Sequence, residues 1–269
     1  MLRIFCVTVT TLGLAAAGLA QSRNQGFGRS PDAWCADTGS NDRASHCEVR
    51  QETIGGANPL DIDAGRNGGI SVQGWDRGDV LIRSKIVGTA DSDAEARRIV
   101  ASVRVDTAGG RIRVDGPSMA DDAQWFVSFE IQVPRSGHLT LKTHNGGIAI
   151  DGFLGTAQFS AQNGGVSLRN VGGDIRGATT NGGLNIDLSG DHWDGTGLDV
   201  ETHNGGIRIA VPEFYSAELE TATTNGRVNI DFPITVQGRI SRQLTTTLGA
   251  GGAKVRAITT NGGVSIHRR

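Results

Sequence analysis

One short motif recurs along most of the chain. In seven places an Asn-Gly dipeptide is followed, after one residue, by an apolar residue, a variable residue and a second apolar residue. The opening asparagines are Asn67, Asn145, Asn163, Asn181, Asn204, Asn225 and Asn261, and a weaker copy runs from Gly109 to Val114. Every copy that opens with asparagine has a second glycine except the one at Asn225, which has Arg227 there. From Asn145 onward the copies are 18, 18, 23, 21 and 36 residues apart, which indicates an internally repeated fold.

Each motif lies between two stretches in which apolar and polar residues alternate. This alternation predicts short strands that each bury one face. After the motif, the residues predicted to point inward are Ile148/Ile150, Val166/Leu168, Leu184/Ile186, Ile207/Ile209, Val228/Ile230 and Val264/Ile266. Before it they are Leu139/Leu141, Ala157/Phe159, Leu198/Val200 and Val255/Ala257, followed by Thr143, Thr179, Thr202, Thr223 and Thr259. The intervening residues Ala149, Ser167, Asn185, Arg208, Asn229 and Ser265 are predicted to face solvent.

Two chain paths fit these strands. Asn-Gly is a strong signal for a two-residue hairpin, because both positions tolerate positive φ, and hairpins would give an antiparallel meander. The alternative is a β-solenoid, in which each repeat forms one coil and equivalent residues stack in ladders. Identical residues at identical offsets favour the solenoid. The 40 glycines among 269 residues then mark turns in a packed chain rather than disorder.

The part of the chain before the regular repeats is less uniform. Residues 79–87 and 125–134 are predicted to be strands. Ser92 and Glu95 form a capping box ahead of apolar residues at helical spacing, which predicts a short α-helix over residues 92–102. We expect this helix to cover or cross one end of the core, where open strand edges need protection. The predicted fold class is therefore all-β: a β-solenoid of short strands with Asn-Gly-Gly turns and one short α-helix.

The first residues resemble a secretory signal peptide. Residues 1–20 combine one basic residue, Arg3, with an apolar stretch and with small residues ahead of Gln21. Cleavage is expected after Ala20, or alternatively near Ala17. A retained membrane anchor is the less favoured alternative, because threonines interrupt the apolar run. The mature chain would then contain an N-terminal extension, residues 21–57, and a repeat domain, residues 58–269, with no transmembrane span.

Cysteine usage agrees with export. Cys6 lies within the predicted signal peptide, which leaves Cys35 and Cys47 as the two thiols of the mature chain. In an oxidising compartment we expect them to form a disulfide, which would contribute up to about 3 kcal/mol to an extension with little apolar surface to bury. A catalytic or metal-binding pair is disfavoured, since no further ligand lies at a suitable spacing.

The sequence offers few groups for catalysis. Its 26 basic and 28 acidic residues give a net charge of −2, so no global field selects nucleic acid, and P-loop and zinc-finger motifs are absent. The adjacent carboxylates Asp121 and Asp122 are predicted to lie in a solvated loop. The carboxylate of calcium-binding β-roll repeats does not recur, and His144 and His203 are too many repeats apart to share a metal ion. We therefore predict no metal and no cofactor.

Two surfaces are candidates for binding. Asp191-His192-Trp193-Asp194 lies in the 23-residue repeat, where an aromatic ring flanked by acids could stack on a sugar, and Tyr215 follows in the next connection. The alternative is that Trp193 folds back over apolar surface. The second candidate is an extended polar row just before the motifs, formed by His144, Gln162, Thr180, His203 and Thr224, which would suit a polymer.

Three charged residues share one offset in consecutive repeats. Asp151, Arg169 and Asp187 would alternate in charge along one face if the repeats stack. Pairs of this kind are worth a few tenths of a kcal/mol each, so we interpret them as structural.

The residues described so far resemble a known family. The recurring Thr-x-Asn-Gly-Gly motif, the signal-like N-terminus, the short helix after the first repeat and the closing Thr260-Asn-Gly-Gly-Val-Ser-Ile are similar to those of a bacterial family of adhesin-like proteins of unknown function. The resemblance covers about Leu60 to Arg269 and implies an exported β-solenoid with Asn-Gly-Gly repeats. It supplies no catalytic residues, and it does not extend to the segment that contains Cys35 and Cys47.

These features together predict an exported adhesin-like or cell-envelope scaffold protein that binds a polymer or protein partner and has no catalytic activity. Its expected location is the periplasm, the cell surface or the extracellular space. Two alternatives stay open. One is a secreted β-helix protein that binds or acts on polysaccharide, and the other is an envelope-stress or regulatory component that binds a membrane protein.

Overall fold

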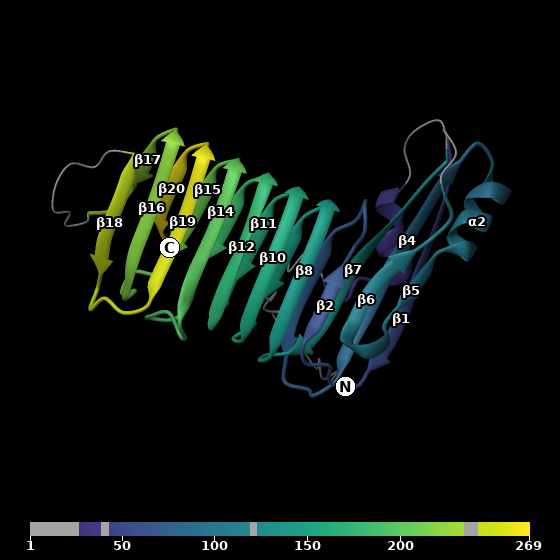
Figure 1. Cartoon of the computed structure of the whole chain (residues 1–269), viewed down its shortest axis with the longest axis horizontal. Coiled ribbons are helices and arrows are strands. Elements are labelled where there is room, and N and C mark those ends of the chain that lie inside the picture. The colour runs from purple at the N-terminus through teal and green to yellow at the C-terminus, as the bar shows by residue number, and fades with distance from the viewer. Residues whose placement is uncertain (1–26, 39–42, 119–122, 234–241) are drawn as a thin grey trace, which may run out of the picture.

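The chain folds mostly into short strands that form two mixed sheets. A computed structural model describes residues 27–38, 43–118, 123–233 and 242–269. Sheet A contains, in spatial order, β1 (Ala44–Ile54), β4 (Val80–Ala90), β7 (Gln124–Pro134), β3 (Ile70–Trp75), β9 (Ile148–Asp151), β11 (Val166–Arg169), β13 (Leu184–Asp187), β15 (Ile207–Val211), β20 (Val264–Arg268) and β17 (Val228–Ile230). Sheet B contains β18 (Gln243–Leu248), β16 (Ala217–Asn225), β19 (Lys254–Asn261), β14 (Gly197–Asn204), β12 (Asp174–Asn181), β10 (Thr156–Asn163), β8 (His138–Asn145), β2 (Leu60–Asp63), β6 (Arg111–Asp115) and β5 (Arg104–Asp106). Figure 1 shows the strands side by side along an elongated molecule.

Each regular repeat forms one coil that crosses from sheet B to sheet A. Strand β8 ends at Asn145 and β9 begins at Ile148, so the chain changes sheet within two residues. The next coil, β10 and β11, pairs with β8 and β9 in parallel and residue for residue, which places Asn163 opposite Asn145. Hairpins would have paired consecutive strands antiparallel. The predicted solenoid-like path is therefore confirmed and the meander is wrong.

The coils do not all stack in chain order. The last coil, β19 and β20, lies between the coil of β14 and β15 and the coil of β16 and β17 (Figure 1). Its inward residues are at most 1 % exposed, whereas Val228 and Ile230 of the displaced coil are half-buried at the end of the stack. Beyond the displaced coil, β18 pairs antiparallel with β16.

The core lies between the two sheets and is aliphatic. Apart from Val228 and Ile230, the residues predicted to point inward are buried, including the five threonines that precede the corners.

The weaker motif copy is an exception to the repeat. Its strand, β6, pairs with β2 in sheet B, whereas the strands after the other corners all lie in sheet A. Gly109 to Val114 is therefore not a corner equivalent to the others.

A ladder of amide hydrogen bonds runs along the corners. The side-chain Nδ2 of each asparagine donates to the Oδ1 of the asparagine in the neighbouring coil, at 2.7 to 2.9 Å. The ladder follows the spatial order Asn67, Asn145, Asn163, Asn181, Asn204, Asn261 and Asn225. The asparagine of the motif thus ties each coil to the next.

The first glycine of the corner is required by close backbone contact. A Cβ atom on Gly164 would overlap the carbonyl oxygen of Gly146 in the preceding coil, and the same holds at Gly146, Gly182, Gly205, Gly226 and Gly262. Of the corner glycines only Gly68 has a φ in the left-handed range, so the conformational freedom of glycine is not the main reason for the motif. The buried threonine just before the corner adds a hydrogen bond: Thr179 Oγ1 donates to the Gly164 carbonyl at 2.7 Å.

One end of the stack is covered by helices and antiparallel strands. Helix α2 (Asp93–Ser102) packs against β1 and β4, and the Ser92 side chain caps it by accepting from the Glu95 amide at 3.3 Å, which confirms the predicted helix. The short helix α1 (Pro31–Cys35) is joined to β1 by the Cys35–Cys47 disulfide, as expected. The 3-10 turns η1 (Ala36–Thr38) and η2 (Ala108–Gly110) complete the helical elements of the described residues. The predicted signal peptide and Asp121-Asp122 lie outside those residues.

A buried ion pair holds the N-terminal segment on the outer face of sheet A. The Arg83 guanidinium contacts the Glu130 carboxylate, donates to the Arg29 carbonyl at 2.6 Å and stacks 5.1 Å from the ring centre of buried Trp34. Burial raises the pKa of Glu130, and the positive charge of Arg83 opposes that rise. The segment that contains Cys35 is therefore packed on the sheet.

The corner glycines give a direct test of the fold. Changing Gly164 to alanine should lower the free energy of unfolding by about 3 kcal/mol, because its Cβ would collide with a backbone atom that cannot move without separating two coils. Changing Gly165 to alanine should cost less than about 1 kcal/mol, since its Cβ would lie 3.4 Å from the Gly183 carbonyl oxygen. Urea denaturation followed by circular dichroism measures both. Equal losses in the two variants would contradict this account.

Candidate binding surface

The outer face of sheet B presents outward side chains in rows that cross the strands. Because neighbouring strands pair residue for residue, equivalent positions of successive coils lie side by side. One row contains Thr140, Gln158, Arg176, Asp199, Arg256 and Glu220. The row nearest the corners contains His144, Gln162, Thr180, His203, Thr260 and Thr224, all exposed except the partly exposed Thr260. The polar corner row expected from the sequence is thus an accessible feature of the fold.

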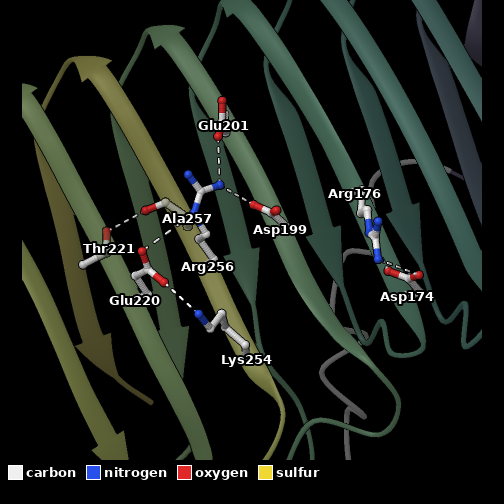
Figure 2. Close-up of polar contacts among 9 residues, drawn as sticks. All are labelled: Asp174, Arg176, Asp199, Glu201, Glu220, Thr221, Lys254, Arg256 and Ala257. Carbon is white, nitrogen blue, oxygen red and sulfur yellow. Dashed lines mark hydrogen bonds and ion pairs between the residues drawn. The ribbon is translucent and has the colours of Figure 1, made fainter.

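A network of charges occupies this face where the last coil is inserted (Figure 2). Arg256 on β19 contacts Asp199 and lies 2.8 Å from Glu201, both on β14. On its other side it lies 3.8 Å from Glu220 on β16, which also pairs with Lys254 at 3.1 Å. One arginine therefore connects three neighbouring strands.

The network raises the pKa of Arg256. Burial of its side chain, which is 25 % exposed, disfavours the charged form, but the hydrogen bonds and negative charges of Glu201 and Asp199 outweigh this and raise its pKa. Two strands away, Arg176 pairs with Asp174 of its own strand at 2.9 Å, its one ion pair among the described residues (Figure 2). The two arginines thus share a row but differ in how many strands they join.

On the outer face of sheet A the row expected from the sequence is present. Asp151, Arg169 and Asp187 are paired neighbours on β9, β11 and β13. Arg169 forms an ion pair with Asp151 at 3.3 Å, whereas Asp187 pairs with Arg269 at 3.0 Å. The ion-pair partner of Asp187 is therefore Arg269 and not its neighbour in the row, Arg169.

The insertion at residues 191–194 does not expose its aromatic ring. Trp193 is 4 % exposed, and its Nε1 donates to the Gly173 carbonyl at 3.0 Å. Tyr215 is also buried; its pKa is raised by burial and by the negative charge of Asp191. Neither ring offers a surface on which a sugar could stack, and the alternative interpretation of Trp193, packing over apolar surface, describes its environment.

The rest of the insertion stays at the surface. Asp191, His192 and Asp194 are exposed, and the Ser216 amide donates to the Asp191 carbonyl at 2.7 Å. His192 lies 2.6 Å from the Asp191 carboxylate, and this hydrogen bond lowers the pKa of Asp191. The insertion and the connection at Tyr215 are therefore neighbours, but they meet through backbone contacts and buried rings.

The described part of the chain contains no group of three or more His, Cys, Asp or Glu side chains placed to hold a metal ion. His144 and His203 lie in the same row with β10 and β12 between their strands. None of the helices within the described ranges has the length and apolar character that a membrane crossing demands.

Comparison with known protein families assigns the repeat region. Residues 58–267 match the family described as Toastrack DUF4097. The chain belongs to the Toastrack DUF4097 family. The match spans the coils from β2 to β20 and includes both outer faces described above. The family description is that of a domain of unknown function, so membership identifies the fold but assigns no activity to these faces.

Solved structures with distant similarity come from several bacteria. A candidate cell adhesion protein from Clostridium sporogenes is 12 % identical, with a TM-score of 0.43, and the match covers 82 % of this chain and 100 % of that one. A candidate adhesin from Bacteroides fragilis is 12 % identical, with a TM-score of 0.33 and coverage of 82 % and 97 %. A candidate lipid-binding protein from Parabacteroides distasonis is 8 % identical, with a TM-score of 0.30 and coverage of 81 % and 96 %. No curated protein matches the sequence.

The charge network around Arg256 was not predicted from the sequence of this Toastrack chain. Asp199, Arg256, Arg176 and Glu220 all lie five residues before the asparagine of their repeat, so an alignment on asparagine places them in one row. The contacts of Arg256 depend on the last coil lying between two earlier ones. Chain order alone would have placed Glu220 beside Asp199.

The environment of Trp193 predicts a structural effect of its removal. Changing Trp193 to alanine should lower the free energy of unfolding by about 3 to 5 kcal/mol, because a large buried side chain and its hydrogen bond are lost. Changing Trp193 to phenylalanine should cost clearly less, since most of the apolar volume remains. Chemical denaturation of both variants tests this. An alanine variant as stable as the parent would show that the ring is not part of the core.

The network predicts a stabilising role for Arg256. Changing Arg256 to methionine should lower the free energy of unfolding by about 1 kcal/mol at low salt, because Asp199, Glu201 and Glu220 lose the cation between them. The loss should shrink in 1 M salt, which screens the carboxylates. Changing Arg176 to methionine is the matched control, because it breaks only one exposed pair. An equal loss in both variants would mean that the network adds nothing beyond single pairs.

Proposed function

We propose that the chain is an exported, non-catalytic, adhesin-like or envelope scaffold protein that binds a polymer along its stacked coils. The supporting observation is the in-register repetition of polar side chains on two exposed faces. A surface of this kind offers similar groups at each strand spacing, about 4.8 Å apart. An extended ligand can therefore contact several coils at once.

Export is supported by the Cys35–Cys47 disulfide and by the signal-like residues 1–20. Disulfides persist in oxidising compartments and are rare in the bacterial cytoplasm. We therefore place the mature chain in the periplasm, on the cell surface or outside the cell, with a cell-envelope polymer or a protein of the envelope as its partner.

The repetition predicts how binding depends on ligand length. A glycan array probed with residues 21–269 identifies the ligand class, and titration calorimetry then compares short and long oligomers of the bound glycan. Affinity should rise with each added sugar until the ligand spans the regular coils, because each added unit contacts a further strand. Incubation with the same polysaccharides should release no fragments.

Two results would contradict the proposal. Affinity that is already maximal for a monosaccharide would indicate a single small-molecule site. Shortening of a polysaccharide chain, detected by size-exclusion chromatography, would indicate catalysis.

A further inference from the structure

A shallow hollow interrupts the outer face of sheet A. It has a volume of about 230 Å³ and crosses four neighbouring strands, β11, β13, β15 and β20. The residues that line it include Ser167, Asn185, Asp187, Arg208, Ala210 and His267. All of these are outward positions on interior strands of the sheet.

The hollow exists because one outward position carries a methyl group. Strand pairing places Arg169, Asp187, Ala210 and His267 in one row. Ala210 has the smallest side chain in this row. The small Ala210 therefore leaves a gap between Asp187 and His267, and Arg208 rises beside it from the adjacent row.

The charges around the hollow do not cancel. Arg169 is paired with Asp151 at 3.3 Å, and Asp187 is paired with Arg269 at 3.0 Å. Arg208 has one polar contact, a long hydrogen bond of 3.4 Å to the Asn185 side chain, and within the described residues it has no carboxylate partner. One guanidinium thus remains uncompensated.

From these observations we propose that the hollow binds the acidic group of an anionic sugar unit, with Arg208 as its principal partner. This deepens the proposed function and rests on it. A guanidinium offers a planar pair of N–H donors that matches a carboxylate in bidentate geometry. Ser167 and Asn185 supply hydroxyl and amide groups for the neighbouring sugar hydroxyls.

The position within the sheet favours a sugar over an acidic peptide. Peptides commonly bind sheets by adding a strand at an open edge. The four strands under the hollow each have a neighbour on both sides, so their backbone groups are already used. Recognition here depends on side chains, which suits a chain of hydroxyls with one acidic group per unit.

The test uses oligogalacturonate as the probe, with its methyl ester as a neutral copy of the same sugar chain. We expect residues 21–269 to bind the acid and to bind the ester at least tenfold more weakly. Changing Arg208 to glutamine should weaken binding of the acid about tenfold, the factor expected from one charged hydrogen-bonding contact. The same variant should bind the ester unchanged.

Changing Arg97 to glutamine is the matched control, because it removes one exposed positive charge from α2, at the other end of the molecule. It should leave binding unchanged, and thermal unfolding should show that both variants are folded. The assignment is overturned if the parent does not bind oligogalacturonate, if Arg208→Gln binds as the parent does, or if poly-glutamate of equal charge binds equally well. If the chain does not bind oligogalacturonate but binds another polymer on the glycan array, the assignment of this hollow is wrong and the proposed function still stands.

Discussion

The fold depends on close contact between backbones at the corners. At the first glycine of each regular corner the neighbouring coil occupies the space where a Cβ would lie, so adjacent coils approach as closely as two main chains can. The asparagine side chain and, in most repeats, a buried threonine hydroxyl lie just before this glycine and add hydrogen bonds at the corner. The asparagine and the first glycine therefore fix both the spacing and the register of the regular coils. At the second glycine a Cβ would lie 2.9 to 3.6 Å from the nearest backbone atom, so this position is less closed than the first, and one copy has Arg227 there.

Register fixed at the corners determines the two outer faces. Since side chains alternate along a strand, a slip of one residue would turn every apolar side chain outward. When the asparagines are aligned, the outward residues of neighbouring coils are aligned as well. This alignment produces the rows of equivalent side chains on the outer faces of sheets A and B. The charge network of Arg256 depends on this alignment. Its partners on β14 and β16 lie within reach because both strands pair with β19 in the same register. The network in turn favours the position of the last coil between two acidic neighbours, so a polar surface feature supports the non-sequential order of the core.

Much of this architecture could be predicted from the sequence, because the motif encodes local geometry. The inward faces, the strands at residues 80–90 and 124–134, the capped helix and the disulfide all follow from patterns of a few residues. The order of the coils could not be predicted, because every coil presents nearly the same edge to its neighbours, and Val264 and Ile266 of the last coil repeat Val228 and Ile230 of the coil before it. The orientation of Trp193 could not be predicted either, since a tryptophan near two acids in the sequence is compatible with a ring that points inward or outward. Here the available apolar surface and the Gly173 carbonyl decided it.

The candidate site on sheet A shows why departures from the repeat matter more for recognition than the repeat itself. A perfectly regular face would bind many polymers weakly and in any register, because each coil would offer the same groups. Ala210 and Arg208 break that regularity on one strand, and the non-sequential last coil brings His267 beside them. One acidic unit of a polymer can then occupy the proposed hollow, while its remaining units contact the ordinary rows. The uniform corners make the molecule long and rigid, and a few irregular side chains give a long ligand a defined place on it.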